Sequence, residues 1–167
     1  SHILERWERQ NDGSFLLVKT NPIASIVIPE LVKGSPTPGQ YYTFQKGSGQ
    51  LFRFNAADLE ATLLADFPFP LIDVVATPDN LLALVDDGVG TSLLKLNFQG
   101  GIIDTVRTYS SAFKADGMGY QNNDLVLLGQ HRSGPAAPYN AWQMWIHTNH
   151  TDAAPPTITM DAELTYV

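Results

Sequence analysis

Two histidines and an aspartate stand close together near the C-terminal end of the sequence, at His147, His150 and Asp152. Histidine nitrogens and carboxylate oxygens are common ligands of zinc and related metals, so this is a candidate metal site. A spacing of three residues puts two side chains on one face of a helix but on opposite faces of a strand. Because the segment follows an alternating strand and runs into a Pro-Pro pair, we expect a loop with no bound metal and no cofactor.

A group of aromatic residues borders the longest loop that is rich in Gly and Pro, and it comprises Tyr139, Trp142 and Trp145. If this segment is a strand, Trp142 lies on the face we expect to be core, and Gln143, Trp145 and His147 share the other face. An indole, an amide and an imidazole together suit stacking on a sugar ring or docking of a protein. The alternative is that a neighbouring sheet covers both faces.

Sequence patterns for nucleophilic catalysis are missing, since no serine sits in a Gly-x-Ser-x-Gly elbow. The serines in turn-like segments are Ser35, Ser48, Ser110 and Ser111. Asp86 and Asp87 are adjacent and do not define an acid and base pair. The acidic residues at the ends of expected strands, where a cation is a possible ligand, are Asp73, Asp104, Asp116 and Asp124. Such residues more often form solvated turns, so we expect no enzyme.

The composition indicates one soluble domain. The chain has 167 residues, 44% of them hydrophobic, which is enough for one sizeable core. A net charge of -7 argues against a nucleic-acid partner. There is no cysteine, and the longest purely apolar run, Leu81 to Val85, is too short to insert into a membrane.

The charge is unevenly distributed along the chain. Residues 1–54 carry six basic and four acidic groups, a balance of +2, and residues 55–167 carry four and thirteen, a balance of -9. Scattered surface charge of this kind ordinarily serves solubility. The functional alternative is head-to-tail association of the basic end with the acidic body.

Short β-prone runs separated by Gly and Pro predict an all-β chain. The runs cover residues 15–20, 23–28, 41–44, 51–54, 71–75, 81–85, 93–96, 102–106, 125–128, 142–146 and 157–160. Two segments depart from this pattern. By local rules residues 55–67 form a helix, with an Asx cap and leucines at helical spacing. Ile3 to Arg9 is a short amphipathic segment, so residues 1–13 are expected to form an arm or short helix before a repeat body of residues 14–167.

An internal repeat of about 43 residues is the most informative feature. Phe52–Asn55 resembles Leu94–Asn97 at an offset of 42, and Leu81–Asp86 resembles Leu125–Gln130 at an offset of 44. A weaker echo, Met144–His147, follows the Leu94 segment at an offset of 50. The repeat places residues 55–67 opposite a segment that contains two adjacent glycines, which favours turn and strand over helix.

The segment Leu71–Arg107, with its Thr-Pro-Asp-Asn turn at residues 77–80, resembles a four-stranded blade of a β-propeller. The sequence has no subfamily signature such as a Trp-Asp dipeptide closing a blade. The resemblance implies just under four blades in 167 residues, near the lower limit of about four for closed propellers, so we expect a minimal propeller or a fragment of a larger one. A two-sheet β-sandwich or barrel made from the same repeats is the alternative.

A repeat array with open edges needs a partner, so we expect a non-enzymatic module for protein–protein assembly. It would be a surface, filament or virion component, soluble, extracellular or on a virion surface, and a homo-oligomer or part of a larger assembly. The apolar C-terminus Leu164–Val167 offers a strand to a neighbour. Glycan binding at Tyr139, Trp142, Trp145 and His147 is the first alternative, and a metal-dependent hydrolase fragment is the second.

Overall fold

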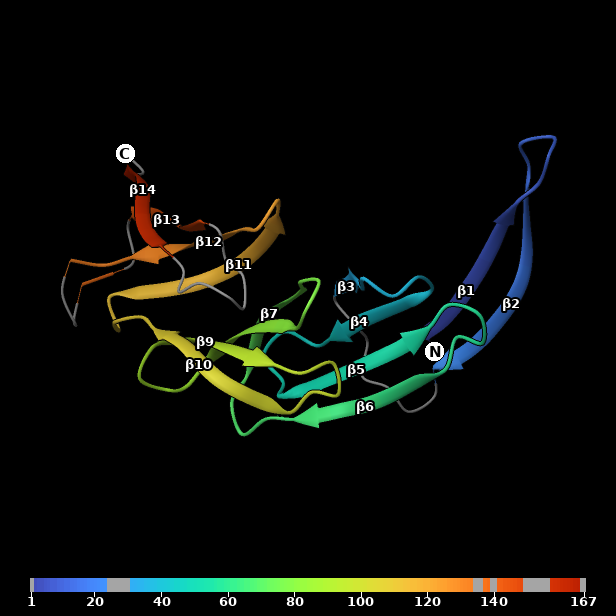
Figure 1. Ribbon diagram of the computed structural model, residues 1–167, viewed down its shortest axis with the longest axis horizontal. Helices are drawn as coiled ribbons and strands as arrows, with labels where there is room; N and C mark the ends of the chain where they lie inside the picture. Colours follow the sequence, from blue (N-terminus) through green and yellow to red (C-terminus); the bar gives the residue numbers. More distant parts are fainter. Residues whose placement is uncertain (1, 24–30, 134–136, 139–140, 149–156, 166–167) are drawn as a thin grey trace.

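The computed structural model describes residues 2–23, 31–133, 137–138, 141–148 and 157–165, and in this part of the chain the regular structure is entirely β (Figure 1). The strands are β1 (His2–Arg9), β2 (Phe15–Ile23), β3 (Leu31–Gly34), β4 (Gln40–Phe44), β5 (Gln50–Asn55), β6 (Ala61–Asp66), β7 (Leu71–Ala76), β8 (Leu81–Asp86), β9 (Thr91–Leu96), β10 (Ile102–Thr108), β11 (Phe113–Gln121), β12 (Asp124–His131), β13 (Ala141–Thr148) and β14 (Thr157–Thr165). The expected all-β class is confirmed. The described residues contain no helix with the length and apolarity needed to cross a bilayer.

The strands form three four-stranded antiparallel sheets, β3–β6, β7–β10 and β11–β14, each with its strands in chain order. The sheets begin at Leu31, Leu71 and Phe113, so successive units start 40 and 42 residues apart. The remaining strands, β1 and β2, pair as a separate hairpin. The repeat therefore yields three sheets and a hairpin. The described residues do not form the two-sheet sandwich that the sequence left open.

The first strands of the sheets lie next to one another, β7 against both β3 and β11, and the later strands run outward from them (Figure 1). This is the arrangement of blades in a propeller, where each sheet buries its faces against its neighbours.

The sequence repeats fall at equivalent places in the sheets. Phe52–Asn55 and Leu94–Asn97 belong to the third strands, β5 and β9, and Leu81–Asp86 and Leu125–Gln130 to the second strands, β8 and β12. The blade expected over Leu71–Arg107 is sheet β7–β10. The repeat interpretation is confirmed.

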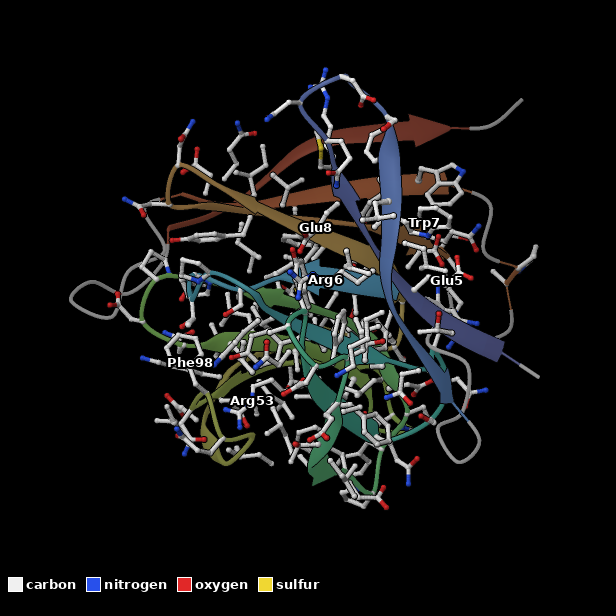
Figure 2. The ribbon with its side chains drawn as sticks, turned by 90° about the vertical axis from the view of Figure 1, so that its right-hand side faces the viewer. Glu5, Arg6, Trp7, Glu8, Arg53 and Phe98 are labelled. Carbon is white, nitrogen blue, oxygen red and sulfur yellow. The ribbon has the colours of Figure 1, made fainter. Side chains whose placement is uncertain are left out.

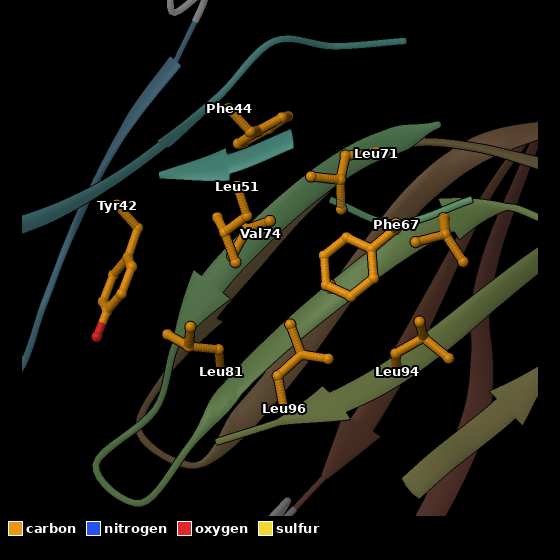
Figure 3. Packing of buried hydrophobic residues seen from close by; sticks show 11 residues of the cluster. Tyr42, Phe44, Leu51, Phe67, Leu71, Val74, Leu81, Leu94 and Leu96 are labelled. Carbon is orange, nitrogen blue, oxygen red and sulfur yellow. The ribbon is translucent and has the colours of Figure 1, made fainter. Parts of the chain in front are cut away.

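The middle sheet is buried on both faces, which explains the unbroken apolar run of β8. The cluster towards sheet β3–β6 is shown in Figure 3 and contains Tyr42, Phe44, Leu51, Phe67, Leu71, Val74, Leu81, Ala83, Val85, Leu94 and Leu96. The cluster towards sheet β11–β14 contains Ile72, Val75, Leu82, Leu84, Leu93, Tyr109, Phe113, Ala115, Met118, Leu125 and Leu127. Alternate residues of β8 thus enter different clusters.

Residues 55–67 form a turn and then β6, as the repeat predicts, and not the helix that local rules favour. The side chain of Asn55 accepts a hydrogen bond from the Ala57 amide at 2.9 Å, and that of Asp58 accepts one from Glu60 at 2.9 Å. These local bonds compete with helical hydrogen bonding. Pairing of β6 with β5 completes the sheet, so tertiary pairing overrides the helical propensity of the leucines and alanines.

The N-terminal segment is a strand, and the short helix considered for Ile3 to Arg9 is wrong. β1 pairs with β2 around a turn that contains Asp12 and Gly13, where Gly13 adopts a φ of 86°. The glycine provides the left-handed backbone that closes this hairpin, and the Asp12 carboxylate accepts a hydrogen bond from the Ser14 amide at 2.9 Å. The arm therefore extends to Ile23, and β2 does not join the repeat body to which its residues were assigned.

Candidate functional site

Trp145 is partly buried and packs against the cluster between sheets β7–β10 and β11–β14. Its ring centroid is 5.8 Å from that of Tyr109 and 6.1 Å from that of Phe113, and the guanidinium carbon of Arg107 is 5.3 Å from the indole centroid. Gln143, which shares this face of β13, is buried. This face of β13 therefore packs against a neighbouring sheet, which is the alternative that the sequence left open.

The faces of β13 are the reverse of those expected. Trp145 pairs with Leu127 on the inner face, while Trp142 and Met144 are half-buried on the outer face. The sequence echo at offset 50 aligned Leu94 with Met144, whereas the strand pairing places Trp145 at the position of Leu94. A slip of one residue exchanges the two faces of a strand.

The aromatic cluster also holds polar atoms. The Nε of Arg107, the Oε1 of Gln143 and the Nε1 of Trp145 are buried, and none of them has a hydrogen-bond partner in the described part of the chain. The Arg107 guanidinium lies over the rings of Tyr109 and Trp145, so cation–π attraction stabilises it there. Burial raises the pKa of the Tyr109 phenol, with a smaller opposing effect of Arg107, so Tyr109 stays uncharged at neutral pH.

The structure describes only some of the other residues proposed as ligands. Tyr139, His150 and Asp152 lie outside the described residues, and His147 is described only as a backbone position of β13 opposite Leu125. Trp142 is separated from Trp145 by the thickness of the sheet. The structure thus does not bring the two indoles of β13 to one surface.

The acidic residues at strand ends do not gather. Asp73 is buried and accepts a hydrogen bond from the Met118 amide at 2.8 Å, and Asp116 forms an ion pair with Lys46 at 2.8 Å. Asp104 is exposed on β10, at the outer edge of its sheet. In the part of the chain that is described, no three His, Asp or Glu side chains are placed to hold a metal ion.

Asp87 organises the turn between β8 and β9. Its carboxylate accepts hydrogen bonds from the Ser92 hydroxyl at 2.7 Å, the Gly90 amide at 2.8 Å and the Val89 amide at 2.9 Å. The bond from Ser92 has the largest effect, and together these donors hold the pKa of Asp87 below its ordinary value of 3.8. The carboxylate is committed to the turn and is not available as a general base.

A shallow groove of about 240 Å³ opens beside this turn, between sheets β7–β10 and β11–β14. Its charged lining comes from Asp86, Lys114 and Arg132. The Nε of Arg132 donates to the Ser111 carbonyl at 3.1 Å, and Ser111 also lines the groove. The lining contains no histidine that would activate this serine, so the groove does not have the geometry of a nucleophilic site.

The hairpin β1–β2 carries the most exposed apolar surface. Trp7, Phe15 and Leu17 share one of its faces and are 52%, 64% and 40% exposed, and Leu16 and Val18 are exposed on the other face. Sequence reasoning missed this surface because it assigned the two strands to different structures. The Asp12–Gly13 turn is the signal that identifies the hairpin.

Among the described residues, hydrogen bonds at the turn between β5 and β6 join the hairpin to the body. Arg6 donates to the Ala57 carbonyl at 3.1 Å, and the Asn21 side chain donates to the Leu59 carbonyl at 2.8 Å. On the hairpin itself the Trp7 indole donates to Glu5 at 2.9 Å, and Arg6 pairs with Glu8. Figure 2 shows these two pairs pointing to opposite sides of β1.

No protein-family model matches the chain, and no curated protein matches it. One solved structure, from a structural and mechanistic analysis of two prolyl endopeptidases, superposes with a TM-score of 0.58 at 14% identity. The match covers 93% of this chain but 23% of that one, where it falls on the propeller domain. Hsv2 from Kluyvelomyces marxianus superposes with a TM-score of 0.43 at 10% identity, over 95% of this chain and 54% of that chain. The first similarity shows a propeller-like fold and nothing about activity.

Proposed function

We propose that this chain is a non-enzymatic module whose role is protein–protein assembly, as a structural component of a surface, filament or virion. The supporting observation is the hairpin β1–β2, which presents Trp7, Phe15 and Leu17 to solvent. A hairpin of two strands is only marginally stable alone in water, and its apolar face gains stability when another surface covers it.

The chemistry of the hairpin suits a protein partner. Aromatic residues are enriched at the centres of protein interfaces, and charged residues at their rims. On the face of Trp7, the apolar side chains lie beside Arg9, which is opposite Phe15, and beside Glu5, which accepts the indole hydrogen bond. This is an apolar patch with a charged border.

The two alternatives receive less support. A glycan platform needs an accessible indole, and Trp145 is packed between sheets. A metal-dependent hydrolase needs converging ligands, and the acidic side chains of β7 and β11 are engaged with Met118 and Lys46.

The experiment that tests the proposal compares the chain with a variant in which Phe15 and Leu17 are replaced by serine. Both positions are exposed, so the variant is expected to keep its β-sheet circular dichroism. We expect weaker self-association or partner binding in sedimentation velocity. Unchanged association of this variant and of the face variants described below would contradict the proposal. Val89→Ser, at an exposed turn, is the matched control.

A further inference from the structure

The sheets pack in the same way at both internal interfaces. The side of one sheet that faces the following sheet packs on the side of that sheet that faces back towards it. In sheet β7–β10, Leu81 and Leu96 pair on the side that faces sheet β3–β6, and Leu82 and Leu84 point to the side that faces sheet β11–β14. Sheet β11–β14 receives the latter side with Leu125 and other residues of its own inner side. Every sheet thus has a side suited to the preceding unit and a side suited to the following unit.

The first sheet has a side of the preceding-unit kind that no described sheet covers. We call it the leading face, and it consists of Tyr41, Thr43, Phe52, Phe54 and Leu63. Tyr41 pairs with Phe54 as Leu81 pairs with Leu96, and their rings stack with centroids 5.1 Å apart. Leu63 and Tyr41 are 48% and 36% exposed and Phe52 is half-buried, whereas Thr43 and Phe54 are buried. The face therefore has core-type residues at the positions that are buried in the second sheet.

The last sheet has a side of the following-unit kind that is likewise uncovered among the described residues. We call it the trailing face, and it consists of Val126, Leu128, Trp142, Met144 and Ile146. Leu128 is 43% exposed and the others are half-buried. A hollow of about 390 Å³ at its edge is lined by Gly119, Tyr120, Gln121, Asn122, Asp124 and Val126.

We propose that the trailing face of one copy of this chain packs on the leading face of a second copy, in the manner of the internal interfaces. This inference rests on the proposed assembly function and names its partner. The two internal interfaces support this pairing. At each of them the following-unit side of one sheet packs on the preceding-unit side of the next, and the trailing and leading faces are sides of these same two kinds.

Side-chain size supports the same pairing. At the interface between the second and third sheets, Val75 and Leu125 belong to one buried cluster. The equivalent position to Val75 on the trailing face is Gly119, and the equivalent position to Leu125 on the leading face is Tyr41. A smaller residue on one face and a larger residue on the other conserve the total volume of the contact.

Charge is compatible with this pairing. Residues 31–66, which form sheet β3–β6, have three basic and three acidic groups, and residues 113–165 have two basic and five acidic groups. Two acidic sheets repel each other more than an acidic sheet and a neutral one, which favours contact between different ends over contact between two trailing faces. A head-to-tail contact forms rings or filaments, and two copies would supply six sheets, within the range of about four to eight for closed propellers.

The test uses Leu63→Glu on the leading face and Leu128→Glu on the trailing face, with Val89→Glu at an exposed turn as control. All three positions are exposed, so the folded monomer should tolerate the charge. Sedimentation velocity should show that each face variant alone self-associates at least about tenfold more weakly than the unmodified chain. An equimolar mixture of the two should regain association, because it keeps one intact face of each kind.

The other outcomes overturn the inference in distinguishable ways. If one face variant associates like the unmodified chain, or if the mixture stays monomeric, the contact is not head-to-tail between these faces. If both variants associate normally, the contact lies elsewhere, and the assembly function survives through the hairpin. If the unmodified chain stays monomeric and binds no partner protein, the assembly function fails together with the inference.

Discussion

The buried carboxylate of Asp73 on β7 accepts a hydrogen bond from the backbone amide of Met118 on β11, at 2.8 Å. The same side chain accepts one from the Val74 amide at 2.8 Å. Asp73 therefore fastens the first strand of the second sheet to the first strand of the third. A residue of the type that could bind a cation is used here to join two repeats.

Replacing Asp73 with alanine should lower the free energy of unfolding by about 1–3 kcal/mol, because the Met118 amide would be left buried without this acceptor. Asp73→Asn keeps an oxygen acceptor and should cost less. Urea denaturation measures both. Equal stability of the alanine variant and the unmodified chain would show that the hydrogen bond does not join the sheets.

Gly49 precedes β5 at a place where the backbone of Phe67 approaches closely. A Cβ at this position would lie 2.0 Å from the Phe67 carbonyl oxygen, which cannot move without disturbing the bond from the Phe67 amide to the Gly49 carbonyl. Gly49→Ala should destabilise the fold by about 1–3 kcal/mol or more. Gly34→Ala, with no atom within 4 Å of its Cβ, is the control and should change stability by about 0.5 kcal/mol at most. Thermal unfolding that does not separate the two variants would be the contrary result.

Trp145→Ala should destabilise the protein by about 3–5 kcal/mol, because it removes a ring that packs against Tyr109 and Phe113. Trp7→Ala removes an exposed indole and should leave folding stability nearly unchanged. Chemical denaturation followed by circular dichroism compares them. A Trp145→Ala variant that keeps full stability but no longer binds a glycan array would support the sugar-binding alternative instead.

The turn held by Asp87 should make stability depend on acid pH. Because the folded pKa lies below the ordinary value of 3.8, the stabilising effect is complete above that value and is lost as the pH falls through the folded pKa. Asp87→Asn should be less stable than the unmodified chain at neutral pH, and the difference should shrink in acid. Melting temperatures across this range measure it, with Asp79→Asn in an exposed turn as control. A difference that does not change with pH would contradict this role.

The repeats could be predicted from the sequence because the third strands β5 and β9 have similar residues, and each leads into a turn that begins with an asparagine. Asn97 accepts hydrogen bonds from the Gln99 and Gly101 amides at 2.9 Å, and Asn55 forms the corresponding turn after β5. Local chemistry and pattern agree at these positions. The same comparison indicates a turn and a strand for residues 55–67, where helix propensity alone indicates a helix.

The faces of β13 could not be predicted because alternation shows two faces without showing which is covered. Trp142 and Trp145 are both aromatic, and each suits a core. Only the pairing of Trp145 with Leu127 decides between them. The hairpin was missed for a related reason, since the charges of β1 also fit a helix and its partner strand lies beyond a turn.

The molar mass of the unmodified chain, measured by light scattering over a wide range of concentrations, tests the assembly function most directly. The exposed side chains of Trp7, Phe15, Leu63 and Leu128 predict a mass that rises with concentration. A strict monomer at every concentration would contradict the account.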